Sequence, residues 1–365
     1  MGFAGLEALL PFLFSLQTET APASPPAREA GPSLAIRLDA RLRGLGEKGF
    51  SGTVLVTRGS EEVLHRGYGW SDAARNHPIA PATPYCVASI SKQFCAAAIL
   101  LLAEGGKLEV GDRIGKFLDG VPRDKEPITL HDLLTHRSGL PQAYASDGIA
   151  DRAEAVRAIL GVPLKGAPGS AFSYSNDGYS LLAAIVEVAS GQPFEVYLRE
   201  NVLRRAGMVE TRFWGEIDPR DPAAFAQVPR FPDGAWGRAS WGWRGATGMV
   251  STPRDLLRWY VALKEGRVLG EEARRRLFGP HVKLSDTEVG YGWFRSRTPR
   301  GTGTLWTRGT EQFGHNALLV DYLDEGTVLV VASNAGEIDG VGWNRRIKDE
   351  LEGLLFPDRA PPGAR

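Results

Sequence analysis

A serine and a lysine one helical turn apart are the first candidates for chemistry. Ser89-Ile90-Ser91-Lys92 is the only S-x-x-K tetrapeptide in the 365-residue chain. Residues three apart on a helix share a face, so the Lys92 amine can reach the Ser89 hydroxyl, a poor nucleophile until a base removes its proton. The surrounding helix is apolar on most sides, and burial lowers the pKa of an amine and equips it as a base. The pattern predicts a nucleophilic serine activated by lysine; a surface serine and a solvated lysine are the alternative.

A tyrosine and an asparagine form the second candidate pair. Tyr174-Ser175-Asn176 is the only Y-x-N in the chain, and it lies in a polar segment that precedes an apolar helix. The Tyr174 phenol can pass a proton to a leaving group, and the Asn176 amide offers both a donor and an acceptor to a substrate. Asn and Asp before a helix are also common N-caps, so a capping role is the alternative.

The combination and its surroundings resemble the class C β-lactamase and penicillin-binding-protein superfamily, in which S-x-x-K is a signature. The resemblance runs from about residue 34 to 356. Besides the two motifs, its matching segments are Thr83 to Lys92 (TPYCVASISK), Leu130 to Leu140 (LHDLLTHRSGL), Phe172 to Gly178, Gly245 to Asp255 (GATGMVSTPRD), Tyr291-Gly292-Trp293 and Val331-Ala332-Ser333-Asn334.

This resemblance implies a role for each matching residue. Ser89 would be acylated by a carbonyl substrate, with Lys92 as base or proton relay, and Tyr174 would share that relay and protonate the leaving group. Asn176 would bind the acyl side of the substrate, and Gln142 resembles a further substrate-contacting residue. The oxyanion hole would combine the Ser89 N–H with one N–H from the strand that carries a third motif.

The third motif departs from the family pattern, which is Lys-Thr-Gly or His-x-Gly. The nearest match is Thr307-Arg308-Gly309-Thr310, and the motif could equally start at Arg308. Gly309 would allow a substrate to approach closely, Arg308 could bind a carboxylate with two hydrogen bonds, and Thr310 completes the predicted substrate-binding set. His315 could point into the site or be a structural histidine. The drift of this motif favours an esterase or a D-amino-acid peptidase over an efficient β-lactamase.

Strand-like segments flank a helical middle. The sequence pattern predicts helices over 34–45, 89–105, 130–136, 150–160, 178–190, 194–202, 253–264 and 343–355. Residues typical of strands, with turn residues between them, predict strands over 50–57, 63–70, 290–297, 303–307, 315–322 and 327–333.

These elements predict an α/β (α+β) fold of the β-lactamase/transpeptidase type. The N- and C-terminal strands would form one antiparallel sheet flanked by the terminal helices, with an all-helical lobe inserted and the site between the two. The expected organisation is a signal peptide and flexible linker over 1–33, a sheet domain over 34–88 plus 286–356, a mostly helical domain over 89–285, and a disordered tail over 357–365.

Composition limits the partners. Lys+Arg and Asp+Glu both number 43, so no net charge favours binding to nucleic acid.

Cys86 and Cys95 suggest two buried thiols without a disulfide. The six histidines show no zinc spacing, and we expect neither metal nor cofactor. The short apolar stretch near the N-terminus cannot span a bilayer and favours export to the periplasm or medium, with the cytoplasm as alternative. The oligomeric state is left open.

We therefore expect a serine hydrolase that forms an acyl-enzyme with a small-molecule or peptide substrate carrying an ester, peptide or β-lactam-like carbonyl. A catalytically inactive, penicillin-binding-like binding or regulatory protein is the alternative. Trp241, Trp243 and Trp259 could line an apolar substrate wall or pack in the core.

Overall fold

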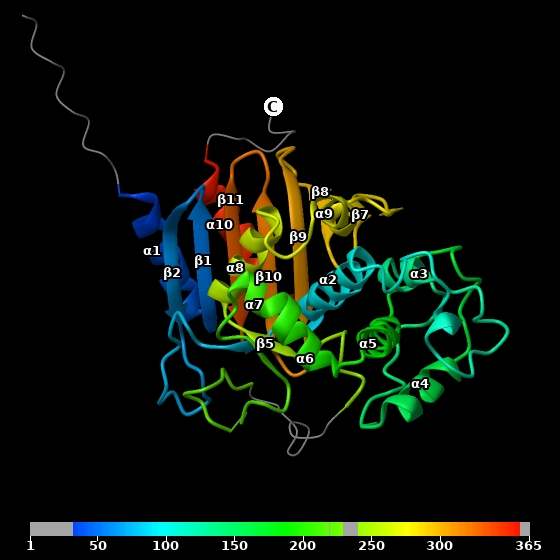
Figure 1. The fold of residues 1–365 in the computed structure, drawn as a ribbon. Coiled ribbons are helices and arrows are strands. Elements are labelled where there is room, and N and C mark those ends of the chain that lie inside the picture. Colours follow the sequence, from blue (N-terminus) through cyan, green and yellow to red (C-terminus); the bar gives the residue numbers. More distant parts are fainter. Residues whose placement is uncertain (1–31, 219, 229–239, 358–365) are drawn as a thin grey trace, which may run out of the picture. The chain divides into compact units, whose positions relative to one another are not determined.

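An antiparallel sheet of eight strands organises the chain (Figure 1). The computed structural model describes residues 32–218, 220–228 and 240–357, and the compact unit begins at Leu34. The strands lie in the order β2-β1-β11-β10-β9-β8-β7-β6. Their bounds are β1 Gly52–Arg58, β2 Glu61–Tyr68, β6 Val282–Lys283, β7 Thr287–Val289, β8 Phe294–Arg297, β9 Gly303–Thr310, β10 Asn316–Tyr322 and β11 Thr327–Ser333.

An N-terminal and a C-terminal strand of the described chain pair with each other in this sheet. β1 pairs with β11 along its whole length, from Gly52 opposite Ser333 to Arg58 opposite Thr327. Every residue of β10 and β11 is buried, which is why residues 317–320 and 328–332 are apolar without alternation. The predicted union of N- and C-terminal strands in one antiparallel sheet is confirmed.

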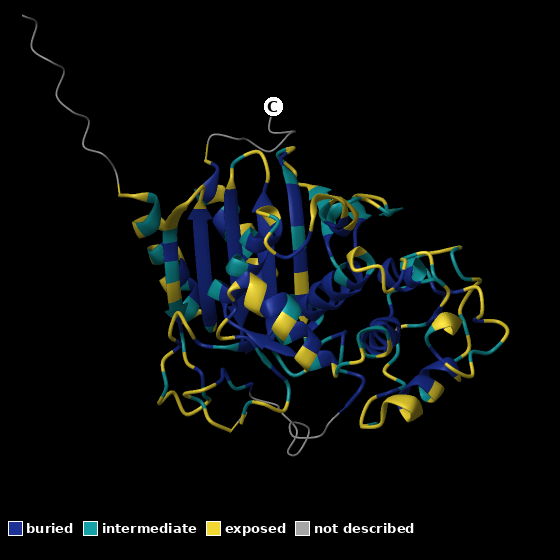
Figure 2. Ribbon diagram, in the orientation of Figure 1, coloured by how far each residue is buried: buried dark blue, intermediate teal, exposed yellow. Residues whose placement is uncertain are grey.

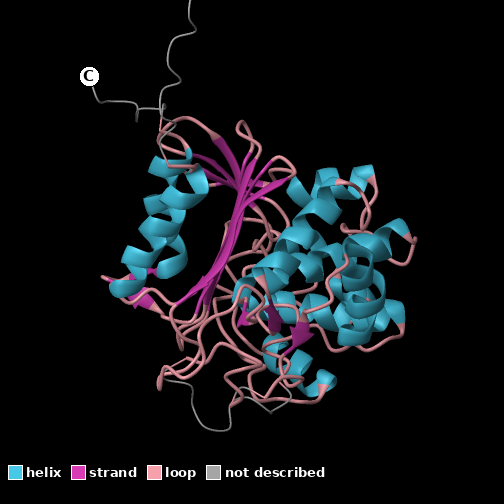
Figure 3. Cartoon of the chain, turned by 90° about the vertical axis from the view of Figure 1, so that its left-hand side faces the viewer, coloured by secondary structure: helices cyan, strands magenta, loops and turns pink. Residues whose placement is uncertain are grey.

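Two helices cover one face of the sheet, as the edge-on view in Figure 3 shows. They are α1 (Leu34–Glu47) and α10 (Trp343–Leu355). Their apolar stripes, including Leu38 and Leu42 of α1 and Ile347 of α10, pack in one core cluster with side chains of β1, β10 and β11. This layer is the predicted pair of terminal helices.

The larger helical layer covers the opposite face and holds the main core (Figure 2). Its helices are α2 Ser91–Glu104, α3 Leu130–Leu134, α4 Arg152–Leu160, α5 Asn176–Ser190, α6 Phe194–Leu198, α7 Arg204–Ala206, α8 Pro253–Lys264 and α9 Glu271–Phe278. A π-helical turn, Arg199–Leu203, joins α6 to α7, and two 3₁₀ turns span Ala88–Ile90 and Ile114–Lys116. α2 and α5 are buried along most of their length and form the centre of this layer.

Several element boundaries differ from the prediction. The strand predicted over 290–297 begins only at Phe294, because Gly292 has φ +74° and turns the chain against the backbone of α2. The helix predicted from Gly178 begins at Asn176, and its N-cap is Ser175, whose hydroxyl accepts from the Gly178 N–H. The prediction that Asn176 or Asp177 supplies the cap is therefore wrong.

Short strands were not predicted at all. A small sheet joins β3 (Tyr85–Cys86), β5 (Met249–Ser251) and β4 (Arg212–Phe213), and a two-stranded pair joins β12 (Glu337–Ile338) to β13 (Val341–Gly342). Strands of two or three residues are too short to show a periodicity of two. The small sheet nevertheless matters, because β3 leads directly to Ser89.

Both cysteines are free and buried, as predicted. Among the described residues no single helix combines the length and apolarity needed to cross a membrane; α5 taken with Phe194–Ala206, a pair bent by 78°, meets those criteria only jointly. Most of the predicted N-terminal leader and linker and of the predicted C-terminal tail lies outside the described residues.

Candidate active site

Ser89 lies in a strained turn at the entrance to α2. The turn Ala88–Ile90 follows β3, and Ala88 adopts φ +45°, a conformation that costs a residue with a Cβ on the order of 1 kcal/mol or more. A hydrogen bond to β5 anchors the start of this turn, since the Val87 N–H donates to the Met249 carbonyl at 3.0 Å. Ala88 and Ile90 are buried, whereas Ser89 is partly exposed. The small sheet and α2 thus present this hydroxyl at the surface of a packed core.

Lys92 lies beneath Ser89 and is almost completely buried, with 2% of its surface exposed. Its Nζ donates to Ser89 Oγ at 3.2 Å, to Asn176 Oδ1 at 2.7 Å and to the Ala246 carbonyl at 3.0 Å. All three acceptors are uncharged, and within the described part of the chain no carboxylate forms an ion pair with Lys92. Burial therefore lowers the pKa of Lys92 to about 7.

The Tyr174 phenol completes the contact with the serine. Its hydroxyl donates to Ser89 Oγ at 2.9 Å. Burial raises the pKa of Tyr174 to about 12, with the Ser89 hydrogen bond and the Arg308 charge opposing the rise. Tyr174 therefore keeps its proton near neutral pH, while a substantial fraction of Lys92 is neutral. This difference identifies Lys92 as the group better able to accept the serine proton.

His136 holds Tyr174 in place, a contact that the sequence did not reveal. The N–H groups on either side of Tyr174 both bond to His136: Ser173 N donates to the His136 carbonyl at 2.7 Å and Ser175 N to Nδ1 at 3.1 Å. The imidazole also stacks on the Tyr174 ring, with centroids 4.2 Å apart and planes inclined by 28°. Burial and the nearby Lys92 charge keep the pKa of His136 well below its usual value, so the ring is neutral.

Strand β9 lies against the Ser89 backbone. A Cβ on Gly309 would come within 2.0 Å of the Val87 carbonyl oxygen and 2.8 Å of the Ser89 nitrogen, so only glycine fits there. Beyond β9, the Glu311 N–H donates to the His315 carbonyl at 2.8 Å. Hydrogen-bonded pairs alternate along an antiparallel ladder, so Thr310, opposite Asn316, directs its N–H to the free edge. The N–H groups of Ser89 and Thr310 can therefore form the expected oxyanion hole.

The other third-motif side chains divide between the two faces of β9. Thr307 is on the same face as Gly309, which is the face toward Ser89, while Arg308 and Thr310 alternate to the face of α10. The Arg308 guanidinium lies over the Trp306 ring at 5.9 Å. Arg308 borders the small cavity that Ser89, Lys92 and Tyr174 also line, but it approaches from the far face of the sheet. The side chain of this motif that faces the serine is therefore uncharged.

Of two further residues predicted to contact the substrate, Asn176 lies at the site and Gln142 does not line its cavity. Asn176 is buried and accepts from Lys92, so its Oδ1 is engaged in holding the amine. Gln142 is exposed in the loop between α3 and α4 and is not among the described residues that line the cavity at Ser89. His315 is buried between Tyr85 and Phe225, as expected of a structural histidine.

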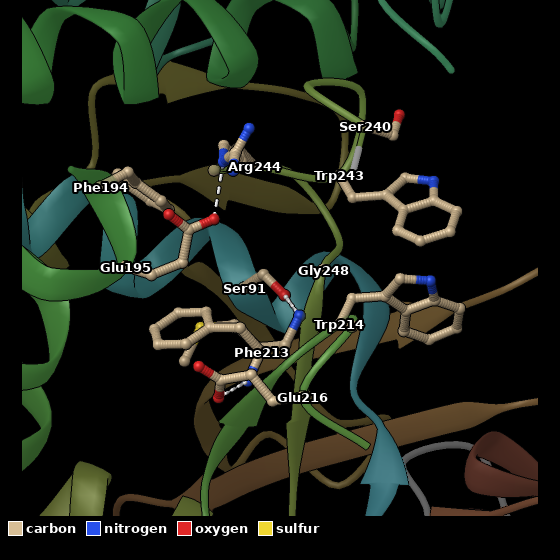
Figure 4. Close-up of a pocket in the computed structure, with 13 residues that line it drawn as sticks. Ser91, Phe194, Glu195, Phe213, Trp214, Glu216, Ser240, Trp243, Arg244 and Gly248 are labelled. Atoms are coloured by element: carbon tan, nitrogen blue, oxygen red, sulfur yellow. Dashed lines mark hydrogen bonds and ion pairs between the residues drawn. The ribbon is translucent and has the colours of Figure 1, made fainter. Parts of the chain in front are cut away.

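A larger cavity, of about 400 Å³, lies beside the first turn of α2 (Figure 4). Ser91 faces it, and the indoles of Trp214 and Trp243 meet edge to face in its wall, 4.6 Å apart. An ion pair between Arg244 and Glu195, 2.6 Å long, closes another side. Trp243 thus lines a cavity, while Trp241 and Trp259 belong to the core. The residues with acyl-transfer chemistry border the smaller cavity, not this one.

Residues 38–352 match the family described as Beta-lactamase. Penicillin-binding protein 4* of Bacillus subtilis (strain 168) is 29% identical over 339 residues, which cover 86% of this chain and 74% of that protein. Among solved structures, the penicillin binding protein from Bacillus halodurans superposes with a TM-score of 0.73 at 26% identity, covering 87% of this chain and 99% of the other.

The same fold occurs in the D-amino acid amidase from Ochrobactrum anthropi SV3. That structure, complexed with L-phenylalanine amide, has a TM-score of 0.74 at 23% identity and covers 90% of this chain and 99% of the amidase. At this identity the likeness concerns the fold alone. It confirms the predicted β-lactamase/transpeptidase architecture.

Proposed function

The chain belongs to the β-lactamase family of serine hydrolases, and from that premise we propose that it hydrolyses small esters, amides or peptides of D-amino acids through an acyl-enzyme at Ser89. The observation that carries the proposal is the convergence on Ser89 Oγ of the Lys92 amine at 3.2 Å and the Tyr174 phenol at 2.9 Å. A buried amine with a pKa of about 7 and a phenol that stays protonated are the base and the acid that acyl transfer needs.

Acylation follows from these positions. Neutral Lys92 accepts the Ser89 proton as Oγ attacks the substrate carbonyl, and the carbonyl oxygen takes up negative charge. The N–H groups of Ser89 and Thr310 stabilise that charge, assisted by the N-terminal dipole of α2. Tyr174 gives its proton to the leaving oxygen or nitrogen as the carbonyl–leaving-group bond breaks, and the Lys92 ammonium returns a proton to Tyr174.

Deacylation repeats the sequence with water as the nucleophile. Water loses a proton to the same relay as it attacks the acyl carbon, and Ser89 leaves as the alcohol after reprotonation. The acid is released and the enzyme returns to its starting state. No residue outside the Ser89, Lys92 and Tyr174 set is required to balance the protons.

The third motif supports the choice of substrate. A β-lactam antibiotic carries a carboxylate, and a lysine or histidine at the first position of that motif would face it. Here Thr307 takes that place on the face toward Ser89, and Arg308 lies on the other face of β9. A threonine in place of that lysine or histidine favours esters and amides without a carboxylate over β-lactams.

Covalent labelling tests the proposal directly. The protein is incubated with a fluorophosphonate and with a fluorescent penicillin, and the adduct is located by peptide mass spectrometry, with Ser89→Ala as the control. Ser89 should carry the fluorophosphonate and lose it in the variant. Absence of any adduct would favour the inactive binding protein instead. Comparing p-nitrophenyl esters with nitrocefin then ranks ester against β-lactam turnover, and faster nitrocefin hydrolysis would contradict the substrate choice.

A further inference from the structure

The larger cavity beside α2 is separate from the site at Ser89 (Figure 4). We call it the aromatic cavity, after the four rings that line it, which belong to Phe194, Phe213, Trp214 and Trp243. Among the described residues, none of those that line it also lines the small cavity at Ser89. Ser91 lines it from α2, and residues two apart on a helical turn, such as Ser89 and Ser91, point to different sides. Its volume of about 400 Å³ is typical of a small-molecule site.

Flat rings dominate the walls of the aromatic cavity. The indoles of Trp214 and Trp243 form a corner, with centroids 4.6 Å apart and planes inclined by 78°. The phenyl rings of Phe194 and Phe213 lie on the other side of the cavity (Figure 4). A planar aromatic molecule can stack on one ring of such a corner and contact the edge of the other. The walls therefore favour a planar ligand.

The charged side chains of the wall are already paired. Glu195 forms an ion pair with Arg244 at 2.6 Å, and Glu216 forms one with Arg199 at 2.5 Å. The charged groups among the described lining residues are Glu195, Glu216 and Arg244, so this part of the wall offers no unpaired charge to a ligand. A charged ligand would lose its hydration without gaining a counter-ion. The ligand should therefore be uncharged.

One buried hydroxyl in the aromatic cavity still has a hydrogen bond to give. Ser91 is 2% exposed, and its Oγ accepts from the Met249 N–H at 3.1 Å. Within the described chain, the proton of this hydroxyl has no acceptor. A buried donor without a partner is costly, and an acceptor atom on a ligand would remove that cost.

A loop over residues 243–249 forms the inner wall of the aromatic cavity. The Trp243 carbonyl accepts from the Gly248 N–H at 2.8 Å, which closes the loop on itself. Ala246 is not among the described residues that line the cavity, and its carbonyl accepts from Lys92 Nζ at 3.0 Å. The loop therefore lies between the cavity and the buried amine.

The end of the same loop anchors the turn of Ser89. Met249 lines the aromatic cavity, and its carbonyl accepts the Val87 N–H at 3.0 Å, directly before the strained residue Ala88. The positions of the nucleophile and of its base thus both depend on where residues 243–249 lie. A molecule in the cavity would touch this loop without touching the substrate.

We infer that the aromatic cavity is a regulatory site, which binds an uncharged, planar aromatic molecule with a hydrogen-bond acceptor and thereby activates the enzyme. Such a ligand favours the loop conformation in which Ala246 and Met249 support Lys92 and the turn of Ser89. Binding should raise kcat and leave KM little changed, because the ligand does not occupy the substrate site. The effect on rate rests on the proposed function, whereas the binding does not.

Three small molecules of similar size test the chemistry of the ligand. Quinoline is planar and uncharged, and its nitrogen is an acceptor. N-methylquinolinium has the same shape with a positive charge and no acceptor, and camphor is uncharged with an acceptor but is not planar. Isothermal titration calorimetry at pH 7.5 should show quinoline binding at least about tenfold more tightly than either, as loss of stacking or of the hydrogen bond implies.

Kinetics with a neutral p-nitrophenyl ester test the activation. Saturating quinoline should raise kcat about twofold or more with KM little changed. Trp214→Leu keeps an apolar side chain but removes one indole, so it should weaken quinoline binding about tenfold and bring the ratio of kcat with and without quinoline to about one. Trp70→Leu is the matched control, since it removes a 40% exposed indole that is not among the described lining residues, and it should keep the full response.

The outcomes separate the regulatory site from the proposed function. No binding of quinoline up to about 5 mM, equal binding of the three molecules, or a response that survives Trp214→Leu would overturn the site. So would a quinoline effect on KM alone, which marks a competitor at Ser89, or bound quinoline that leaves kcat unchanged or lower. If Ser89 takes no fluorophosphonate and no ester is hydrolysed, the activating role fails with the proposed function, while calorimetry alone decides the binding. The wild-type series decides the matter even if Trp214→Leu does not fold.

Discussion

At the scale of single residues, the proposed chemistry depends on keeping an amine uncharged inside the protein. Lys92 is held by three neutral acceptors and, in the part of the chain that the structure describes, by no carboxylate, an arrangement that suits a base and penalises the ammonium form. The same arrangement has a cost in stability. The pKa of Lys92 falls from 10.5 to about 7 on folding, so the unfolded chain binds more protons between these values and native stability rises with pH across this window.

Lys92→Met should therefore abolish turnover and stabilise the fold. We expect a gain of about 0.5–2 kcal/mol at pH 7 or below, which shrinks as the pH approaches 10 because the wild type no longer has to lose a proton on folding. Urea unfolding at pH 6, 8 and 10 measures the gain. In the wild type, the rate of acylation should increase about tenfold for each pH unit up to pH 7 and become constant above pH 7, because only neutral Lys92 can accept the Ser89 proton. A variant less stable than the wild type at every pH would contradict the assignment.

His136 should act as a positioning residue for Tyr174. Asparagine tolerates the φ of +58° and can accept from the Ser175 N–H, but it lacks the stacked ring. We expect His136→Asn to lower kcat about tenfold and His136→Ala more, with KM little changed, since the proton relay is loosened and the substrate contacts remain.

The pH profile distinguishes this role from general damage. Loss of the ring admits water next to Lys92, so the rising limb of the rate profile should move to higher pH in His136→Ala. A purely structural effect would lower the rate without moving that limb. Thermal melting of both variants supplies the control for folding.

The meeting of Ser89, Lys92 and Tyr174 could be predicted because two motifs that each occur once were found together. The strain at Ala88 and the contact between His136 and Tyr174 could not be predicted, because each depends on what a distant segment places beside the residue. Asn176 shows the same limit: its motif was visible, but its bond to the Lys92 amine was not.

At the scale of elements, one glycine sets how closely β9 approaches the turn of Ser89. The two nearest atoms that a Cβ on Gly309 would meet, the Val87 oxygen and the Ser89 nitrogen, belong to the backbone, which cannot move aside as a flexible side chain can. The predicted strand over 303–307 marked this element but ended before Gly309, since glycine is depleted in strands and interrupts the strand pattern. The pairing with β10 extends it to Thr310.

Gly309→Ala should separate β9 from Ser89 and lower kcat/KM about a hundredfold or more, because the Thr310 N–H moves with the strand, and loss of one oxyanion donor costs about 10²–10³ in rate. Gly303→Ala in the same strand is the matched control, since its Cβ would meet only Leu323 Cδ1 at 3.7 Å. Steady-state kinetics on a neutral ester measures both. Equal activity of the two variants would show that the approach of β9 is unimportant.

At the scale of the whole molecule, one sheet separates two cores and belongs to both. Leu55 and Val330 face the helical core, while Val54, Val56 and Val331 face the core under α1 and α10. The union of distant strands was predictable from strands at both ends of the chain. The exact residues at which helices and strands begin could not be predicted, since they depend on turns such as the one at Gly292 and on caps such as Ser175.

Shared strands couple the two cores. Ile347→Ala on α10 removes a fully buried side chain and should cost about 2–5 kcal/mol. We expect tryptophan fluorescence and ester hydrolysis to be lost at the same urea concentration, which is lower than in the wild type, because the layer under α10 cannot unfold while leaving β1 and β11 in place. Hydrolysis that outlasts the fluorescence change would show that the layers unfold separately.

The pairing of β1 with β11 also has a consequence for synthesis on the ribosome. The Ser333 hydroxyl bonds to the Ser51 carbonyl across 282 positions of sequence. At about 5–20 residues per second, β1 would leave the exit tunnel roughly 15–60 seconds before β11 does. Throughout that interval the apolar strand Gly52–Arg58 has only the β2 hairpin to pair with. Nascent chains should therefore recruit holding chaperones early and release them only as the last strand emerges.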